Sequence, residues 1–147
     1  TCANIRLDGA NAKDVLAGCD LAVSCLDNVQ TRHVLNEACV ESGTALVDGG
    51  VQGFGGYVLA VRPGLTPCYR CIFPQTGNAS KPAGVLGATA GVIGSLMAVQ
   101  AVKYLLGIEK GCNFLIADLY TLSFSPVRAN INPDCPVCQK KRNGSAR

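Results

Sequence analysis

The first fifty residues alternate between short apolar runs and a segment with helical spacing. The run Leu21–Leu26 is almost unbroken in its apolar character, which is typical of a parallel strand covered on both faces. From Val29 onward, apolar residues recur at helical spacing until Gly43, where a glycine suits the left-handed end of a helix. The pattern then predicts a second buried strand at Ala45–Val47.

Two shorter elements precede these. Asn4–Leu7 is a candidate for a short strand, and Ala12–Ala17 predicts a brief helical turn before Gly18. The order of elements is therefore β-α-β-α-β, the alternation that builds a parallel sheet with helices on its faces.

After this unit the chain becomes rich in glycine, and a strand is predicted at Tyr57–Val61. The segment Phe73–Pro82 lacks apolar periodicity and is predicted to be a loop of about ten residues. Phe114–Ala117 and the alternating segment Tyr120–Phe124 predict two arms of a hairpin that turns near Asp118.

The longest apolar segment runs from Val85 to Gly107. Its stretch without charge, Val85–Val102, just reaches the length of a membrane-spanning helix. Small residues gain little from lipid, so we favour a buried central helix and expect no membrane association. Gly87, Gly91 and Gly94 share one helical face, which predicts close contact with a neighbouring backbone.

Composition narrows the class of protein. The formal net charge is +3, but four cations lie in the last eight residues, so the body of the chain is close to neutral. This argues against a protein that works by sequence-independent binding to nucleic acid. Only 16% of the residues are charged and 48% are hydrophobic, which excludes disorder and indicates a surface covered in part by a partner chain.

The ends of the sequence add two expectations. The chain begins with Thr1 and its only methionine is Met97, so we interpret it as a piece of a longer protein. A secretory signal is not visible, and we expect a cytoplasmic protein.

The nine cysteines carry the strongest chemical signal. Four of them form two CxxC motifs, Cys68 with Cys71 and Cys135 with Cys138. Two such pairs predict a tetrahedral structural zinc site that joins segments distant in the sequence. Free thiols and disulfides are the alternatives, whereas a thioredoxin-like redox motif would need a single CxxC at the start of a helix.

Asp27 and Asn28 follow a buried strand at its carboxyl end, where open α/β sheets bind their ligands. A carboxylate here could hold magnesium beside nucleotide phosphates, or either residue could cap the following helix. Arg32 lies one turn further, facing a phosphate or solvent. The single histidine, His33, has no nucleophile placed with it, which favours a structural role.

Taken together, the motifs resemble the ThiF/MoeB/HesA family of enzymes that activate ubiquitin-like proteins. The resemblance extends from Asp20 to Gln139 and rests on five blocks in order: CLDNVQTRHVLNEAC, LVDGGVQGFGGYV, PCYRCIFP, AGVLGATAGVIGSLMAVQAVKYLLG and NPDCPVCQ. It implies an α/β fold in which a partial Rossmann-like parallel sheet is extended by antiparallel strands. Residues 1–147 would then be one domain, the C-terminal portion of an adenylation domain without its N-terminal ATP-loop half.

The resemblance also implies a function. Members of this family use ATP and magnesium to adenylate the C-terminal glycine carboxylate of a sulfur carrier of the thiamine or molybdopterin type, and they form homodimers. By this resemblance Asp27 matches the aspartate that binds magnesium and ATP, and Asn28 matches its neighbour at the nucleotide. Cys68, Cys71, Cys135 and Cys138 match the zinc ligands.

Two departures from the family pattern bear on this prediction. The glycine-rich phosphate loop, the acidic residue that binds ribose and the basic residues that hold phosphates would all lie upstream of Thr1. Ser80 occupies the position of the reactive cysteine, which weakens a sulfur-transfer step but leaves adenylation untouched.

The alternative to an adenylating enzyme is a catalytically incomplete, zinc-stapled module for dimerisation and partner docking.

Overall fold

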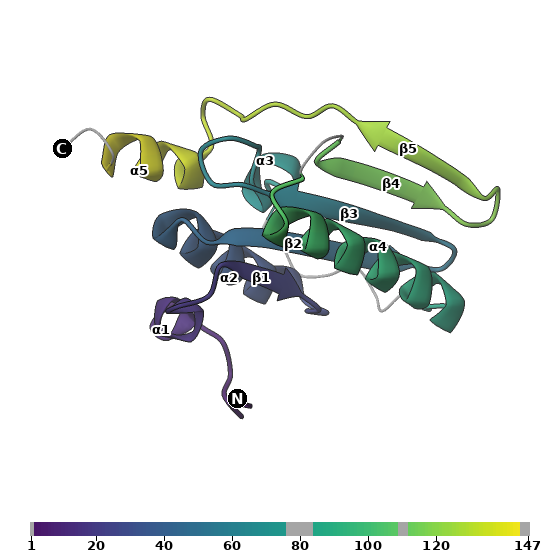
Figure 1. Cartoon of the computed structure of the whole chain (residues 1–147), viewed down its shortest axis with the longest axis horizontal. Coiled ribbons are helices and arrows are strands. Elements are labelled where there is room, and N and C mark those ends of the chain that lie inside the picture. Colours follow the sequence, from purple (N-terminus) through teal and green to yellow (C-terminus); the bar gives the residue numbers. More distant parts are fainter. Residues whose placement is uncertain (1, 76–83, 109–111, 145–147) are drawn as a thin grey trace.

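The computed structural model describes residues 2–75, 84–108 and 112–144. Five strands and five helices are assigned within these ranges (Figure 1). They are, in chain order, α1 (Ala12–Leu16), β1 (Leu21–Ser24), α2 (Val29–Ser42), β2 (Ala45–Gln52), β3 (Gly55–Val61), α3 (Tyr69–Ile72), α4 (Gly87–Leu105), β4 (Phe114–Asp118), β5 (Ser123–Val127) and α5 (Pro136–Gly144).

The strands form one mixed sheet in the order β1-β2-β3-β4-β5. β1 and β2 are parallel, and each of the remaining neighbours is antiparallel. A parallel pair extended by antiparallel strands is the arrangement expected above. The helices lie on both faces of the sheet, with α4 along β2 and β3 on one face and α2 behind the sheet on the other (Figure 1).

Alternate side chains along β2 and β3 point to opposite faces of the sheet and pack into two separate cores. Leu46 and Leu59 face α2 and join the larger core with residues of α1, α3 and α5. Val47 and Val58 point to the opposite face and pack with Ile93 of α4 in a smaller core. This is the period-two pattern of a sheet that is covered on both sides.

The prediction for the start of the chain was wrong in part. Asn4–Leu7 is not a strand: it runs irregularly and mostly exposed, and no strand pairs with it among the described residues. β1 ends at Ser24, two residues earlier than predicted, and Val23 is 47% exposed, so this strand is not covered on both faces. The helix α2 ends as predicted at Gly43, which has a φ of 82°.

The second arm of the predicted hairpin is displaced along the chain. It was expected at Tyr120–Phe124 but begins at Ser123, because Asp118 accepts hydrogen bonds from the backbone amides of Tyr120 (2.9 Å) and Thr121 (3.4 Å). These bonds hold the residues after β4 in a turn, although their apolar alternation is that of a strand.

α4 differs from the buried central helix that was predicted. Only its sheet-facing residues Thr89, Ile93 and Met97 are buried. A Cβ atom added at Gly94, or at the other two glycines of its predicted contact face, would meet no described atom within 4 Å. By length and composition alone α4 is long and apolar enough to cross a membrane, but its Ile93 and Met97 pack on the sheet.

The close approach between α4 and the sheet is made by strand glycines instead. A Cβ on Gly56 would lie 2.6 Å from Cγ1 of Ile93 and 2.9 Å from the carbonyl oxygen of Gly50. Any side chain larger than hydrogen would therefore collide with both the helix and the neighbouring strand.

We therefore expect Gly56→Ala to lower the free energy of unfolding by about 1–3 kcal/mol, the usual cost of overpacking a core. Gly94→Ala is the matched control, since its added methyl meets no described atom. Alanine is also a better helix former than glycine, and it should stabilise the protein by up to about 1 kcal/mol. Urea unfolding followed by circular dichroism measures both changes. Equal stability of the two variants would contradict this packing.

Candidate functional site

The four cysteines of the two CxxC motifs meet in one place, as the sequence predicted. Cys68 and Cys71 lie at α3, and Cys135 and Cys138 lie at the start of α5. Their Sγ atoms all lie within 4.8 Å of one another. We call these four residues the cysteine cluster.

The spacing within the cysteine cluster suits a tetrahedral metal ion. Sγ–Sγ distances are 3.8 Å for Cys68–Cys71, 3.7 Å for Cys68–Cys135 and 3.6 Å for Cys71–Cys138. Four thiolates about 2.3 Å from a tetrahedral ion stand roughly 3.8 Å apart. None of these cysteines is in a disulfide, so the donor set is available to a metal.

Burial shapes the chemistry of these thiols. Cys68 is 1% exposed, and its burial raises the pKa of its thiol to about 11. A buried thiol loses its proton readily only when a cation takes the proton's place on the sulfur, so metal binding here would release protons. The cluster is therefore a set of four thiols that could hold a metal ion once they are deprotonated.

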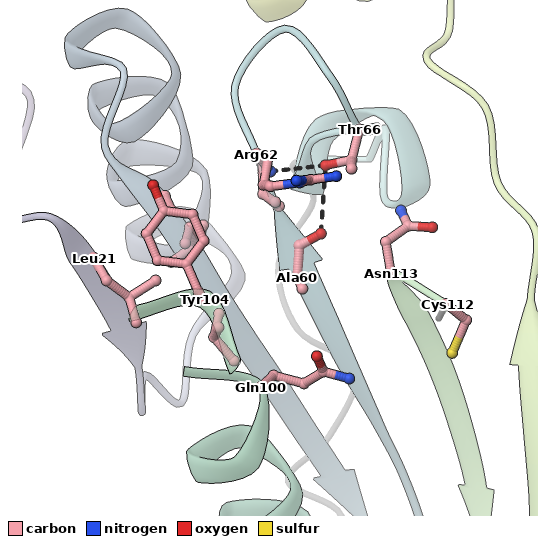
Figure 2. A pocket seen from close by; sticks show the side chains of 12 residues that line it. Leu21, Ala60, Arg62, Thr66, Gln100, Tyr104, Cys112 and Asn113 are labelled. Atoms are coloured by element: carbon pink, nitrogen blue, oxygen red, sulfur yellow. Dashed lines mark hydrogen bonds between the residues drawn. The ribbon is translucent and has the colours of Figure 1, made fainter. Parts of the chain in front are cut away.

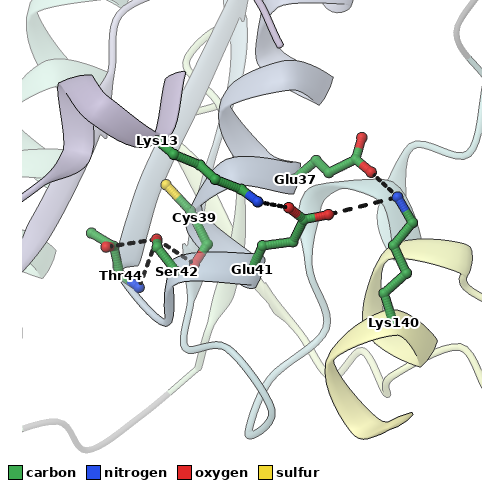
Figure 3. Close-up of polar contacts among 7 residues, drawn as sticks. All are labelled: Lys13, Glu37, Cys39, Glu41, Ser42, Thr44 and Lys140. Carbon is green, nitrogen blue, oxygen red and sulfur yellow. Dashed lines mark hydrogen bonds and ion pairs between the residues drawn. The ribbon is translucent and has the colours of Figure 1, made fainter. Parts of the chain in front are cut away.

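Ion pairs join α5, one of the two helices of the cluster, and α1 to α2. Lys140 of α5 forms ion pairs with Glu37 and Glu41 of α2, and Lys13 of α1 pairs with Glu41 at 2.6 Å (Figure 3). Because Lys13 and Lys140 are largely exposed, these pairs contribute little to stability. The packing of α1 and α5 against α2 in the larger core carries this connection.

Asp27 and Asn28 lie in the exposed loop between β1 and α2. Asn28 is the N-cap of α2, and its side chain accepts a hydrogen bond from the backbone amide of Thr31 at 2.8 Å. The helix-capping alternative is therefore confirmed for Asn28. Asp27 Oδ1 accepts a bond from Asn28 Nδ2 at 3.2 Å, and the side chain is otherwise exposed. A role for either residue at a nucleotide stays a prediction.

Arg32 neither faces solvent nor stands free for a phosphate. Its Nη1 atom lies 2.7 Å from Asp48 Oδ1 and 2.7 Å from the carbonyl oxygen of Gly49, and its Nη2 donates to the carbonyl of Leu26. Tyr57 donates its hydroxyl hydrogen to Asp48 Oδ2 at 2.8 Å. The guanidinium thus joins the segment after β1 to the middle of β2 and holds the backbone directly before Asp27.

Asp48 is the charged residue that the sequence reasoning missed. It is 1% exposed, and its burial raises the pKa of its carboxyl group, against the attraction of Arg32. The only signal was a carboxylate placed directly after a buried strand, with an arginine one helical turn past the preceding strand. That signal does not separate an internal ion pair from a ligand site.

His33 has the surroundings of a structural residue. Its Nε2 atom lies 3.1 Å from the carbonyl oxygen of Gln75, and its ring packs edge-on against Tyr69 with centroids 5.0 Å apart. Burial lowers the pKa of its imidazole. These contacts agree with the structural role predicted for His33. Ser80 lies outside the described residues.

A pocket of about 140 Å³ opens at the opposite end of the sheet from Asp27 (Figure 2). Leu21, at the amino end of β1, lines it, and its polar lining includes Arg62, Gln100, Tyr104 and Asn113. No residue of the pocket belongs to the cysteine cluster or to the loop after β1. The sequence did not predict this pocket.

Comparison with known proteins gives a consistent result. A model of the ThiF family matches residues 1–137. The sulfur carrier protein adenylyltransferase of Thermus thermophilus is 38% identical over 146 residues, a match that covers 91% of this chain and 54% of that protein. The sulfur carrier protein ThiS adenylyltransferase of Escherichia coli is 36% identical and is covered to 55%, by 90% of this chain. The chain thus spans about half the length of the curated relatives it matches.

Solved structures agree on the fold. A crystal structure of Escherichia coli MccB with ATP superposes with a TM-score of 0.76 over 95% of this chain and 45% of that chain. The sequence identity is 17%, so this likeness supports the fold alone, a mixed sheet with its helices. It carries no argument about chemistry.

The buried ion pair gives a test of the site's architecture. Arg32→Leu leaves Asp48 buried without its cation and should cost about 3–5 kcal/mol in the free energy of unfolding. Adding Asp48→Asn should recover part of this loss, because the uncompensated charge is removed. Urea unfolding of both single variants and the double variant measures the coupling. Losses that simply add would contradict the pairing.

Proposed function

Because this chain belongs to the ThiF family, we propose that it is part of an ATP-dependent adenylyltransferase that activates the C-terminal glycine carboxylate of a ubiquitin-like sulfur carrier protein. The observation that carries the proposal is its identity of 36–38% to two proteins named as sulfur carrier adenylyltransferases. The carrier is of the thiamine or molybdopterin type. The segment alone is inactive, and the intact protein carries the activity.

The proposed reaction converts a poor electrophile into a reactive one. A carboxylate oxygen of the carrier attacks the α-phosphorus of ATP, the bond from that phosphorus to the bridging oxygen breaks, and pyrophosphate leaves with the electron pair. The product is an acyl adenylate. This step needs no nucleophile from the protein, so Ser80 is compatible with it.

Asp27 is the residue that would hold magnesium, with Asn28 beside the nucleotide. Three features support this assignment: the carboxylate is exposed, it follows the carboxyl end of β1, and it adjoins the N-terminus of α2. Bound magnesium would offset the charge of the triphosphate. Arg32 keeps the loop in place through the carbonyl of Leu26.

The metal of the cysteine cluster is, in our proposal, zinc in a structural role. Four sulfur ligands at tetrahedral spacing favour zinc, which needs neither water nor a change of redox state. The ion would fasten α3 and α5 to one another across a long stretch of sequence.

A second candidate function is a zinc-stapled module for dimerisation and partner docking, which is catalytically incomplete as a segment. The exposed side of α4 favours it, since Val99, Val102 and Leu105 are each more than half exposed. We further propose that the intact protein is a cytoplasmic homodimer and that the chain is a single domain, the C-terminal portion of the adenylation domain.

Exchange of pyrophosphate into ATP, driven by a candidate carrier, separates the two functions. We expect exchange by the intact protein and none by this segment alone. Asp27→Ala in the intact protein should reduce exchange by about 100-fold or more, because metal-based charge stabilisation supplies several kcal/mol.

Asp20→Ala is the matched control, since Asp20 is an exposed aspartate before the opposite end of β1. It should leave exchange unchanged, and both variants should keep their zinc. Retained exchange in Asp27→Ala would place the magnesium site elsewhere, and no exchange by the unmodified intact protein would leave only the docking module.

The metal assignment has its own test. We expect one zinc ion per chain by elemental analysis, and its removal by a chelator should lower the free energy of unfolding by several kcal/mol. Cys135→Ser should abolish stoichiometric binding, whereas Cys19→Ser, at an exposed cysteine outside the cluster, should not. A melting temperature unaffected by the chelator would refute a structural metal.

A further inference from the structure

Asn36 of α2 has an unusual position beside the cysteine cluster. It is fully buried, and its Oδ1 atom accepts a hydrogen bond of 2.8 Å from the backbone amide of Tyr69, the residue directly after Cys68. This bond fixes the plane of the side-chain amide. Asn36 therefore anchors the first CxxC motif to α2.

The nitrogen of the same side-chain amide has no acceptor in the part of the chain that the structure describes. Asn36 Nδ2 is buried, and it has no hydrogen-bond partner among the described residues. An unpaired buried donor costs about 1–3 kcal/mol, so its presence calls for an explanation.

Cys68 offers the acceptor. It directly precedes Tyr69, whose amide the other end of the same side chain holds, and it is itself buried. Burial raises the pKa of the Cys68 thiol, and the Asn36 side chain is among the groups that oppose this rise. A neutral thiol is a weak acceptor, whereas a thiolate accepts hydrogen bonds well. The donor and the acceptor are therefore matched only when Cys68 is deprotonated, as it is in a metal complex.

We propose that Asn36 is a positioning residue of the metal centre: its Oδ1 holds the backbone of the first CxxC motif, and its Nδ2 donates an N–H···S hydrogen bond to the metal-bound Cys68 thiolate. Four thiolates on a divalent ion carry a net charge of about −2 in a buried site, and a donor aimed at one sulfur offsets part of it. The inference rests on the proposed metal centre but not on adenylation.

Two substitutions separate the two halves of this role. Asn36→Asp retains an oxygen that can accept from the Tyr69 amide but loses the N–H donor. Asn36→Leu fills similar space and loses both. The same two substitutions at Asn113 are the matched controls, because Asn113 also has a buried Nδ2 without a partner among the described residues, in a pocket that includes none of the cluster cysteines.

The readouts are zinc affinity and cobalt spectra of the full 147-residue chain. Competition with a chromophoric chelator should show zinc binding weakened about 10–100-fold in both Asn36 variants, the usual effect of losing a partner of a metal ligand. Cobalt loaded in place of zinc should show its sulfur-to-metal charge-transfer band at lower energy, because a thiolate without a hydrogen-bond donor is easier to oxidise. Both Asn113 variants should match the unmodified chain.

The outcomes distinguish this inference from its premises. Asn36→Asp with unchanged zinc affinity and an unshifted cobalt band would overturn the hydrogen bond to Cys68, even if Asn36→Leu binds weakly. If Asn36→Asp does not fold, the cobalt band of Asn36→Leu decides. An unmodified chain that binds neither ion would overturn the inference together with the metal centre. Absence of pyrophosphate exchange in the intact protein, with normal metal binding by the 147-residue chain, would refute only the adenylation proposal.

Discussion

The buried ion pair between Arg32 and Asp48 is the constraint around which this end of the molecule is arranged. One guanidinium reaches the carbonyl of Leu26 after β1 and both Asp48 and Gly49 of β2. A charge pair inside a protein is stabilising only when its remaining hydrogen-bonding positions are filled, and here Tyr57 and two backbone carbonyls fill them. The two parallel strands and the first turn of α2 thus become one rigid unit, with Asp27 projecting from its edge.

α2 connects this unit to the cysteine cluster. Asn28, Arg32 and Asn36 follow one another at intervals of four residues and so share a face of the helix. Asn28 caps the helix, Arg32 binds Asp48 of β2 and the backbone after β1, and Asn36 holds the backbone at Tyr69. If a metal binds at the cysteine cluster, as proposed, the bond between Asn36 and Tyr69 links it to the helix that follows the Asp27 loop, without direct contact between the two sites.

The sequence predicted the parts of this structure that depend on local pattern. The helix α2 with its end at Gly43 was confirmed, because local spacing and turn chemistry determine it. The meeting of the two CxxC pairs was confirmed although they are distant in the sequence, because each pair is itself a local motif that implies the other as metal ligands. The parts that failed depend on partners distant in the sequence. Asn4–Leu7 has the composition of a strand, but no strand pairs with it among the described residues. The role of Arg32 in α2 depended on Asp48 in β2, a contact that no local pattern reveals.

The two faces of α4 show how the same segment serves packing and remains available for association. Its sheet side is held by Ile93 and Met97 over glycines of β2 and β3, where no larger side chain fits without displacement. Its outer side is apolar and exposed, as at Val99 and Val102, and the sequence carries no charge from Val85 to Val102. Covering such a face gains about 25 cal/mol for each Å² removed from water. Since Asp27 belongs to the loop after β1 and not to this helix, a partner chain could cover α4 while that loop stays open, so docking and nucleotide chemistry are compatible roles of one fold.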